Sequence, residues 1–154
     1  MNIVPLDPAR ADAQALLALS DAYMQALYPA ESNHLESPLA LAQPNVLFLG
    51  VEIDGELAAC GAVKTMDDDG VYGEIKRVFV LDRHRGKGLS KQIMQRLEAH
   101  LQVTGVPLAR LETGISQPEA LALYEKLGYS YRAPFGKYQL DPLSVFMEKR
   151  IGQP

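Results

Sequence analysis

The sequence predicts an α/β fold, in which helices cover a mixed β-sheet. Strand-like and helix-like patterns alternate along the chain in the order β, α, a brief α, then β, β, β, α, β, α, β and β. The Asp54-Gly55 dipeptide joins two strand-like runs as a hairpin turn would, and glycine stops follow two of the helix-like segments. Because no repeat, low-complexity segment or linker divides the sequence, residues 1–154 are expected to form a single domain.

The N-terminal part is predicted to supply a strand and a long helix. Residues 2–6 are strand-like, and Pro8 lies where helices commonly begin. A helix is expected over residues 9–27, where four side chains at spacings of three and four form one core-facing stripe. They are Leu16, Leu19, Tyr23 and Leu27. After Pro29 the chain is polar, with a brief helix around residues 35–42, and such a loop can border a binding site.

Residues 46–66 are predicted to form an antiparallel hairpin. The runs VLFLGVEI and LAACGAVKTM have the composition of strands, and Asp54-Gly55 between them suits a type I′ turn. Three carboxylates follow at residues 67–69. Their mutual repulsion favours a solvated turn, and three consecutive side chains cannot all point at one metal ion from a regular element.

The central part should contain a strand, a helix and a second strand. The first strand is expected over residues 71–81, and the helix over residues 87–104 ends at the Gly105 stop. One i, i+4 stripe of the helix should face the core. It consists of Leu89, Ile93, Leu97 and Leu101. The next strand is expected over residues 107–113, with Gly114 breaking it.

The C-terminal part is predicted to be a helix and two strands. The helix over residues 117–127 has Pro118 in its first turn and Gly128 at its stop. Its apolar face consists of Ala120, Tyr124 and Leu127. Strands are expected over residues 129–132 and 144–151, around a turn-rich segment. An exposed C-terminal strand could pair across a dimer, so the chain is expected to be a monomer or a homodimer.

The composition excludes several classes of protein. The formal net charge of -4 argues against a general nucleic-acid binder, which needs a broad basic surface. No apolar run approaches the ~18 residues of a membrane span, and residues 1–10 lack the apolar core of a signal peptide, so a cytoplasmic protein is expected. Cys60 is the sole cysteine and can build neither an internal disulfide nor a cysteine-based zinc site. We expect it to be a small core residue, and we expect no metal site.

The segment EIKRVFVLDRHRGKGLSK, residues 74–91, is the strongest candidate for a binding site. Its apolar run, residues 78–81, is expected to be a buried strand that leads into a basic loop and then a helix. The loop cations are Arg83, His84, Arg85, Lys87 and Lys91. Gly86 and Gly88 allow a ligand to approach the backbone, and the helix start offers free N–H groups to an anion. The segment therefore predicts a phosphate cradle, with a solvated surface turn as the alternative.

Two motifs resemble those of a known superfamily. Residues 83–88 match RxxGxG, and in this respect the sequence resembles the GNAT superfamily of acyl-CoA N-acyltransferases. Residues 111–129, LETGISQPEALALYEKLGY, resemble its second signature, a strand followed by NxxAxxLYxxxGF, with Gln117 where asparagine is usual. The resemblance covers most of residues 46–151. It implies a GNAT-like fold, in which a central, mostly antiparallel sheet has a splayed pair of parallel strands and helices on both faces.

The resemblance also implies roles for individual residues, with acetyl-CoA as the acetyl donor. The pyrophosphate of coenzyme A would be held by Arg83, Arg85, Gly86, Lys87, Gly88, Leu89 and Ser90. Val80 would pair its backbone with the pantetheine arm, and Gln117 would hydrogen-bond to that arm. The N–H of Val78 would point at the thioester carbonyl. Glu74 falls where several members carry the general base, and Tyr124 where many carry the general acid.

The chemistry of an acetyl transfer suits these residue types. An alkyl amine is almost entirely protonated at pH 7, and its neutral form costs roughly 4.6 kcal/mol, so a base such as Glu74 must take a proton, directly or through water. The alternative for Glu74 is an ion pair with Lys76 or Arg77. Tyr124 can protonate the departing thiolate, and its alternative is a core tyrosine whose hydroxyl bonds to backbone.

The acceptor is the least determined part of the prediction. Lys76 and Arg77 could bind a carboxylate or phosphate of the substrate. Ser32, Asn33, His34 and residues 135–138 could line its pocket. The leading hypothesis is acetylation of a primary amine of a small metabolite, such as an amino acid or another anionic amine. The alternatives are acetylation of a protein N-terminus or lysine, and a non-catalytic CoA-binding regulatory module. A deep acceptor pocket would favour the small molecule, and an open groove the peptide.

Overall fold

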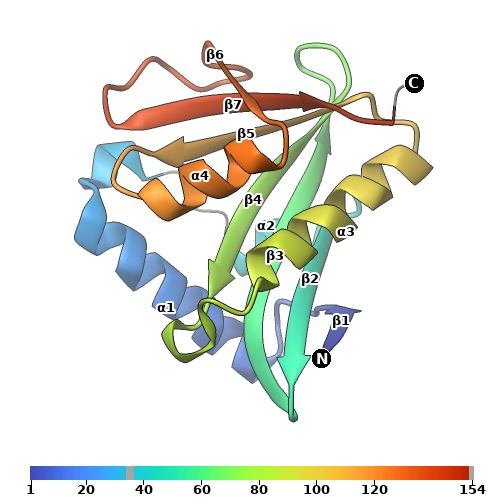
Figure 1. Ribbon diagram of the computed structural model, residues 1–154, viewed down its shortest axis with the longest axis vertical. Helices are drawn as coiled ribbons and strands as arrows, with labels where there is room; N and C mark the ends of the chain where they lie inside the picture. The colour runs from blue at the N-terminus through green and yellow to red at the C-terminus, as the bar shows by residue number, and fades with distance from the viewer. Residues whose placement is uncertain (34–36, 153–154) are drawn as a thin grey trace.

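The computed structural model describes residues 1–33 and 37–152, and its centre is a seven-stranded sheet in the order β1-β2-β3-β4-β5-β7-β6 (Figure 1). The strands are β1 (Asn2–Pro5), β2 (Val46–Ile53), β3 (Glu56–Met66), β4 (Tyr72–Val80), β5 (Leu108–Gly114), β6 (Ser130–Arg132) and β7 (Ser144–Arg150). The helices are α1 (Ala11–Leu27), α2 (Pro38–Leu41), α3 (Leu89–Val103) and α4 (Pro118–Lys126), with 3-10 turns η1 (Ala30–Ser32) and η2 (Asp82–His84). Every strand pair is antiparallel except β4 and β5, so the predicted mixed sheet is confirmed.

Helices α3 and α4 cover one face of the sheet, and α1 and α2 cover the other (Figure 1). The predicted stripe of α3 is confirmed, because Leu89, Ile93, Leu97 and Leu101 are all buried against β-strand side chains. Burying a side chain of this size contributes about 1.5–3 kcal/mol. The helix lies close to the sheet, since a Cβ on Gly61 would be only 2.5 Å from Cγ2 of Ile93.

The prediction for the core face of α1 is partly wrong. Leu16 is buried as expected, but Leu19 is 52% exposed. The side chains that α1 buries are Ala13, Leu16, Leu17 and Ser20. Because this helix is rich in alanine, two neighbouring stripes have similar hydrophobicity. The stripe that contains the small Ala13 and Ser20 lets the helix approach the sheet more closely.

The hairpin prediction is confirmed in its turn geometry. Asp54 and Gly55 join β2 to β3 with φ values of 50° and 81°, and a type I′ turn requires positive φ at both positions. Tight turns of this kind fix the register of the two strands. The turn therefore fixes β3 against β2, and β3 in turn pairs with β4.

Two expectations about the C-terminal part are corrected. Gly114 does not break its strand but is the last residue of β5, where it pairs with Ser144. The position needs glycine because a Cβ there would lie 1.9 Å from the hydroxyl of Tyr28. The C-terminal strand β7 is also not an exposed edge, because β5 and β6 pair with its two sides. The edges of the sheet are β1 and β6.

A bulge in β4 changes the direction in which its side chains point. Gly61 of β3 lies opposite two residues of β4, Arg77 and Val78, and Arg77 has φ of +59°. The guanidinium of Arg77 pairs with Asp21 of α1, whereas Val78 turns to the other face and packs near Ile93 of α3. The bulge thus brings Val78 to the face that carries α3 and α4.

The parallel strands β4 and β5 separate along their length (Figure 1). Their register ends at the pair Ile75 and Leu111, although β4 continues to Val80 and β5 to Gly114. This is the splayed parallel pair that the sequence resemblance implied. Beyond Ile75 the edge of β4 that faces β5 has no strand partner in the described part of the chain, so an extended ligand can lie along it.

Candidate active site

A small cavity fills the space where β4 and β5 separate. Its volume is about 90 Å³, and it is lined by side chains from both strands and from the start and middle of α4. Residues predicted from sequence line it, among them Glu74, Lys76, Arg77, Val78, Gln117 and Tyr124. The structure therefore brings together residues that belong to two separate sequence motifs.

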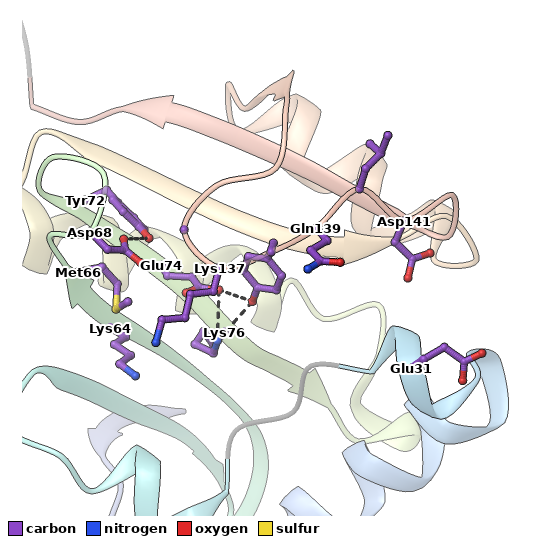
Figure 2. A pocket seen from close by; sticks show the side chains of 13 residues that line it. Glu31, Lys64, Met66, Asp68, Tyr72, Glu74, Lys76, Lys137, Gln139 and Asp141 are labelled. Carbon is purple, nitrogen blue, oxygen red and sulfur yellow. Dashed lines mark hydrogen bonds and ion pairs between the residues drawn. The ribbon is translucent and has the colours of Figure 1, made fainter.

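A larger cavity of about 600 Å³ adjoins the first one (Figure 2). Its walls are formed by β3, β4 and residues 136–141, with Glu31 from η1. Glu74, Lys76 and Tyr138 line both cavities, so these three residues form the junction between them. The small cavity can hold a reacting group, while the larger one has the size of a typical metabolite site.

Glu74 is held at this junction by two polar partners. Its side chain is buried, with a residue exposure of 5%. The ammonium of Lys76 lies 3.2 Å from Oε2 of Glu74, and the hydroxyl of Tyr138 donates a hydrogen bond of 2.5 Å to the same oxygen. The ion pair weighed as the alternative for Glu74 is therefore present with Lys76, and it lies inside the cavity.

Glu112 is a site residue that the sequence reasoning missed. It lines the small cavity on β5, and its burial raises the pKa of the carboxyl to about 7 against the lowering effect of a hydrogen bond with Ser144. The charge of Glu74 raises this pKa further, and that of Lys76 lowers it. A carboxyl with this pKa can accept a proton at neutral pH. The signal was a carboxylate inside the strand-like run LARLETG, which also contains Arg110.

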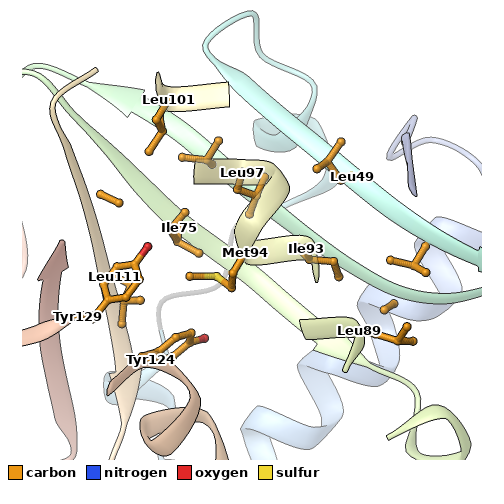
Figure 3. Packing of buried hydrophobic residues seen from close by; sticks show 14 of the residues in the cluster. Leu49, Ile75, Leu89, Ile93, Met94, Leu97, Leu101, Leu111, Tyr124 and Tyr129 are labelled. Atoms are coloured by element: carbon orange, nitrogen blue, oxygen red, sulfur yellow. The ribbon is translucent and has the colours of Figure 1, made fainter. Parts of the chain in front are cut away.

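Tyr124 lies at the edge of the cluster beneath α3 (Figure 3). Burial raises the pKa of its hydroxyl to about 12, with a further contribution from the charge of Glu112, so the group stays protonated at neutral pH. Within residues 1–33 and 37–152 no group hydrogen-bonds to this hydroxyl. Tyr124 is thus a core residue, as the alternative held, but its hydroxyl makes no backbone hydrogen bond within the described residues.

Gln117 is oriented by a tyrosine from the end of α1. The hydroxyl of Tyr28 donates to Oε1 of Gln117 at 3.1 Å and accepts from the N–H of Ser116 at 3.1 Å. This fixes the amide at the wall of the small cavity, where its NH₂ group can donate to a cofactor arm.

The glycine-rich loop before α3 is open to solvent, as a phosphate cradle requires. Gly86 and Gly88 have φ values of 81° and 75°, and nothing lies within 4 Å of a Cβ built on either. Gly88 precedes the first turn of α3, which no side chain caps, so its N–H groups can bind an anion. Leu89 is buried beneath the loop and Ser90 is half-buried.

The cations of this loop differ in how accessible they are. Arg83 pairs with Glu56, and His84 lies with Nε2 2.7 Å from the same carboxylate. His84 is 8% exposed, and its pKa is lowered by burial and by the nearby charges of Lys87 and Arg83. Nζ of Lys87 is 2.8 Å from Nδ1 of His84. His84 is therefore a buried support of the loop, not one of its surface cations.

Arg85 links the loop to the strand before it. Its guanidinium lies over the ring of Tyr23 at 5.0 Å, and its Nε donates to the carbonyl of Val80 at 3.4 Å. The Val80 carbonyl was expected to pair with the cofactor arm, so a bound arm must share or displace this contact.

The residues predicted to bind the acceptor lie in different places. Lys76 is at the junction of the cavities, but Arg77 has 3% of its side chain exposed and pairs with Asp21 at 2.6 Å. Asn33 donates to two backbone carbonyls of the preceding turn and lines neither cavity. His34 lies outside the residues that the structure describes.

Two further expectations concern Cys60 and metals. Cys60 is fully buried in β3, and burial raises the pKa of its thiol to about 12, which makes it a core residue and a poor nucleophile.

In residues 1–33 and 37–152 we find no cluster of three or more His, Cys, Asp and Glu side chains that could hold a metal ion. Over the same residues, no helix has the length and apolarity needed to cross a membrane.

Comparisons with known proteins agree with this arrangement. The model of the acetyltransferase (GNAT) family matches residues 13–129. A relative named IAA acetyltransferase, from Azospirillum brasilense, is 44% identical over 131 residues, or 85% of each chain. The uncharacterized N-acetyltransferase YsnE of Bacillus subtilis (strain 168) is 37% identical over 83% of this chain and 85% of its own.

Solved structures agree as well. A Klebsiella pneumoniae protein assigned to the acyl-CoA N-acyltransferases superimposes with a TM-score of 0.83, at 37% identity and with 97% of both chains covered. The PaiA N-acetyltransferase of Thermoplasma acidophilum, in complex with coenzyme A, has a TM-score of 0.72 at 17% identity. That match covers 97% of this chain and 99% of the other, and at this identity it shows the fold alone.

Proposed function

The chain belongs to the acetyltransferase (GNAT) family, and we propose that it transfers the acetyl group of acetyl-CoA to a primary amine of a small metabolite. Acetyl-CoA is the donor that this family uses. The observation that carries the proposal is the meeting of two cavities at Glu74, a narrow one between the splayed strands and one of about 600 Å³ beside it. The first suits the thioester, and the second suits an acceptor.

The donor is proposed to bind across the head of α3. Main-chain N–H groups and nearby cations of the exposed loop would hold its pyrophosphate. The residues proposed for this role are Arg83, Arg85, Gly86, Lys87, Gly88, Leu89 and Ser90. The pantetheine arm would follow the unpaired edge of β4 past Val80, assisted by Gln117, and bring the thioester to Val78.

A carboxylate is proposed to take the proton from the attacking amine. Glu74 is the first candidate, because it is buried at the junction of the two cavities. Glu112 is a second candidate, favoured by the burial that raises the pKa of its carboxyl to about 7. Either could act directly or through a water.

The remaining steps follow from the positions of Val78 and Tyr124. The nitrogen lone pair of the amine forms a bond to the thioester carbon, and the N–H of Val78 would stabilise the charge on the oxygen. The carbon–sulfur bond then breaks. Tyr124 would give its proton to the thiolate, which releases free CoA thiol and the acetylated amine. An ammonium acceptor loses two protons from its nitrogen in forming the amide. The carboxylate would take them in turn, returning one to the Tyr124 phenolate and releasing the other to solvent.

The cavity favours a small acceptor over a peptide. A volume of about 600 Å³ lies within the range of small-molecule sites, and residues 136–141 form part of its wall. Acetylation of a protein amine and a non-catalytic CoA-binding module are the competing functions. The proposed functional unit is residues 1–154, as a monomer or homodimer in the cytoplasm.

A thiol-release screen with acetyl-CoA tests the proposal. The acceptors would be amino acids, polyamines, aminoglycosides and short peptides, each assayed for free CoA thiol and for the acetylated product by mass spectrometry. Turnover of a small amine supports the proposal. Turnover of peptides alone indicates a protein acetyltransferase, and binding of acetyl-CoA without turnover of any amine indicates a regulatory module.

A further inference from the structure

We propose that Lys64 and Lys137 bind an acidic group of the acceptor, so that the substrate is a small primary amine that also carries a carboxylate or a phosphate. This inference rests on the proposed function, and it names the chemistry by which the same site selects its acceptor. Sequence reasoning assigned the anion to Lys76 and Arg77, whose charges the structure commits to Glu74 and Asp21.

Lys64 is the cross-strand neighbour of Glu74. The two residues are register partners in β3 and β4, so their side chains leave the same face of the sheet, with Cβ atoms about 5 Å apart. The carboxylate of Glu74 nevertheless pairs with Lys76 and Tyr138. Lys64 is half-buried at the cavity wall and has no ion pair or hydrogen bond to its ammonium within residues 1–33 and 37–152.

Lys137 reaches the same cavity from the opposite wall. It follows Gly136, whose φ is +59° and where a Cβ would lie 3.0 Å from the hydroxyl of Tyr72. The hydroxyl of the next residue, Tyr138, donates to Glu74, and this contact ties the segment to β4. Figure 2 shows the side chains of Lys64 and Lys137 extending into the cavity. Lys137 also lacks an ionic partner in the described part of the chain.

The acidic residues of the cavity form no ion pair with these two lysines within residues 1–33 and 37–152. Asp68 accepts a hydrogen bond of 2.6 Å from Tyr72 and lies at the same end as Lys137, since its Oδ2 would be 3.1 Å from a Cβ on Gly136. Asp141 accepts from the hydroxyl of Ser32 at 2.7 Å. Glu31 and Asp141 lie at the other end of the cavity from Lys64 in Figure 2. At the end beside Glu74, three lysines (Lys64, Lys76 and Lys137) outnumber two carboxylates (Glu74 and Asp68), so this end keeps an excess of one positive charge. Glu31 and Asp141 make the other end acidic.

An acidic group on the acceptor would supply the missing counter-charge. An anion between Lys64 and Lys137 lies next to Glu74, where the amine must be deprotonated, so one short molecule can satisfy both positions. Hydrogen bonds between an ammonium and a carboxylate or phosphate change affinity by about 10- to 100-fold. Cationic acceptors such as polyamines would be repelled at this end of the cavity.

Matched acid and amide substrates test the inference. The panel pairs β-alanine with β-alaninamide, L-methionine with L-methioninamide, and O-phosphoethanolamine with ethanolamine, in a thiol-release assay with acetyl-CoA. The wild type should prefer the acid of a pair by about 10-fold or more in kcat/KM. Comparison of the carboxylate and phosphate pairs identifies which anion the site takes.

Substitutions of Lys64 and Lys137 then test whether these two residues cause the preference for the acid over the amide. Lys64→Met and Lys137→Met should each raise KM for the acid about 10-fold, with kcat and the KM for acetyl-CoA within about 2-fold of wild type. The double variant should lose the preference for acid over amide, and Lys64→Arg should keep it. Lys126→Met is the control, since Lys126 is an exposed lysine on α4 outside both cavities.

The outcomes separate this inference from the proposed function. Turnover of small neutral amines or polyamines without a loss in the lysine variants overturns the inference and leaves the proposed function intact. Absence of thiol release with every amine overturns the proposed function. In that case the same acids are titrated into the CoA complex by calorimetry, and binding that Lys64→Met and Lys137→Met do not weaken overturns the inference too.

Discussion

Two carboxylates at the junction of the cavities have different surroundings. Glu74 contacts an ammonium and a tyrosine hydroxyl, whereas Glu112 has Ser144 as its hydrogen-bond partner. Burial raises the pKa of Glu112 to about 7. Two titratable groups in unlike environments commonly divide acid and base roles between them. The pH dependence of turnover can therefore assign the base.

Replacing Glu112 by Gln tests this residue directly. In the wild type, kcat/KM should fall as the pH drops below about 7, because a protonated Glu112 cannot accept the proton of the amine. The variant should lose about 100-fold in kcat and lack this limb of the profile. The measurement is the rate of thiol release between pH 5.5 and 8.5.

Glu74→Gln is the matched comparison for that profile. If the fall in kcat/KM below pH 7 is unchanged in Glu112→Gln but absent in Glu74→Gln, the base is Glu74.

Unfolding supplies an independent check on Glu112. Its raised pKa means that the folded state holds the carboxyl proton of Glu112 more tightly than the unfolded chain does. The stability of the wild type relative to Glu112→Gln should therefore fall as the pH rises from about 4.5 to about 7.

The Tyr124→Phe variant should show what the hydroxyl contributes to catalysis, because the substitution keeps the ring and its packing. The hydroxyl has no hydrogen-bond partner in residues 1–33 and 37–152, so its removal should change the free energy of unfolding by less than about 1 kcal/mol. We expect kcat to fall about 10- to 100-fold with little change in the KM for acetyl-CoA. Tyr131→Phe, at an exposed tyrosine on β6, is the control. Full activity of Tyr124→Phe would exclude it as the acid.

At the scale of elements, the loop before α3 depends on two left-handed glycines. Gly86→Ala and Gly88→Ala each place a Cβ at φ near +80°, which costs about 1–2 kcal/mol, but the space around both positions is open. The chain should still fold, and its affinity for acetyl-CoA should fall about 10-fold or more, as measured by calorimetry. Gly55→Ala in the hairpin has the same φ and open space, and it should lose similar stability without losing affinity.

The bulge in β4 depends on a glycine in the neighbouring strand. Gly61→Ala would put a Cβ 2.5 Å from Cγ2 of Ile93, and overpacking of this kind costs about 1–3 kcal/mol in unfolding free energy. Ile93→Ala removes the clashing atom, so the two changes together should cost less than the sum of each alone. Additive losses in denaturant unfolding would contradict the close contact that we describe between β3 and α3.

Local sequence signals predicted most elements of this fold, but they could not predict the bulge. The Asp54-Gly55 turn and the i, i+4 stripe of α3 depend on neighbouring residues, and both were confirmed. The φ of +59° at Arg77 has no such local cause, because arginine does not favour it. It accompanies tertiary contacts, namely the pairing of β4 with β3 opposite Gly61 and the ion pair with Asp21 of α1, which join segments far apart in the sequence.

At the scale of the whole molecule, the proposed site residues come from five segments, namely β3, β4, β5, α4 with its N-cap, and the segment before β7. The two motifs were visible in sequence because their spacing is local, and they identified Glu74, Val78, Gln117 and Tyr124 as neighbours. The order of strands in the sheet was not visible. It brings further charged residues to the site, namely Lys64 from β3, Glu112 from β5 and Lys137 from the segment before β7. The proposed roles of these three residues depend on the two cavities, which meet where β4 and β5 separate.

Acetyl transfer by the double variant Glu74→Gln, Glu112→Gln is the most direct test of the account. Free CoA thiol and acetylated amine would be measured together, with acetyl-CoA affinity determined by calorimetry on the same samples. We predict equal amounts of thiol and product from the wild type, and in the variant a rate at least 100-fold lower with acetyl-CoA affinity within about 2-fold. Turnover of the variant at the wild-type rate would contradict the claim that transfer takes place at the junction of the two cavities.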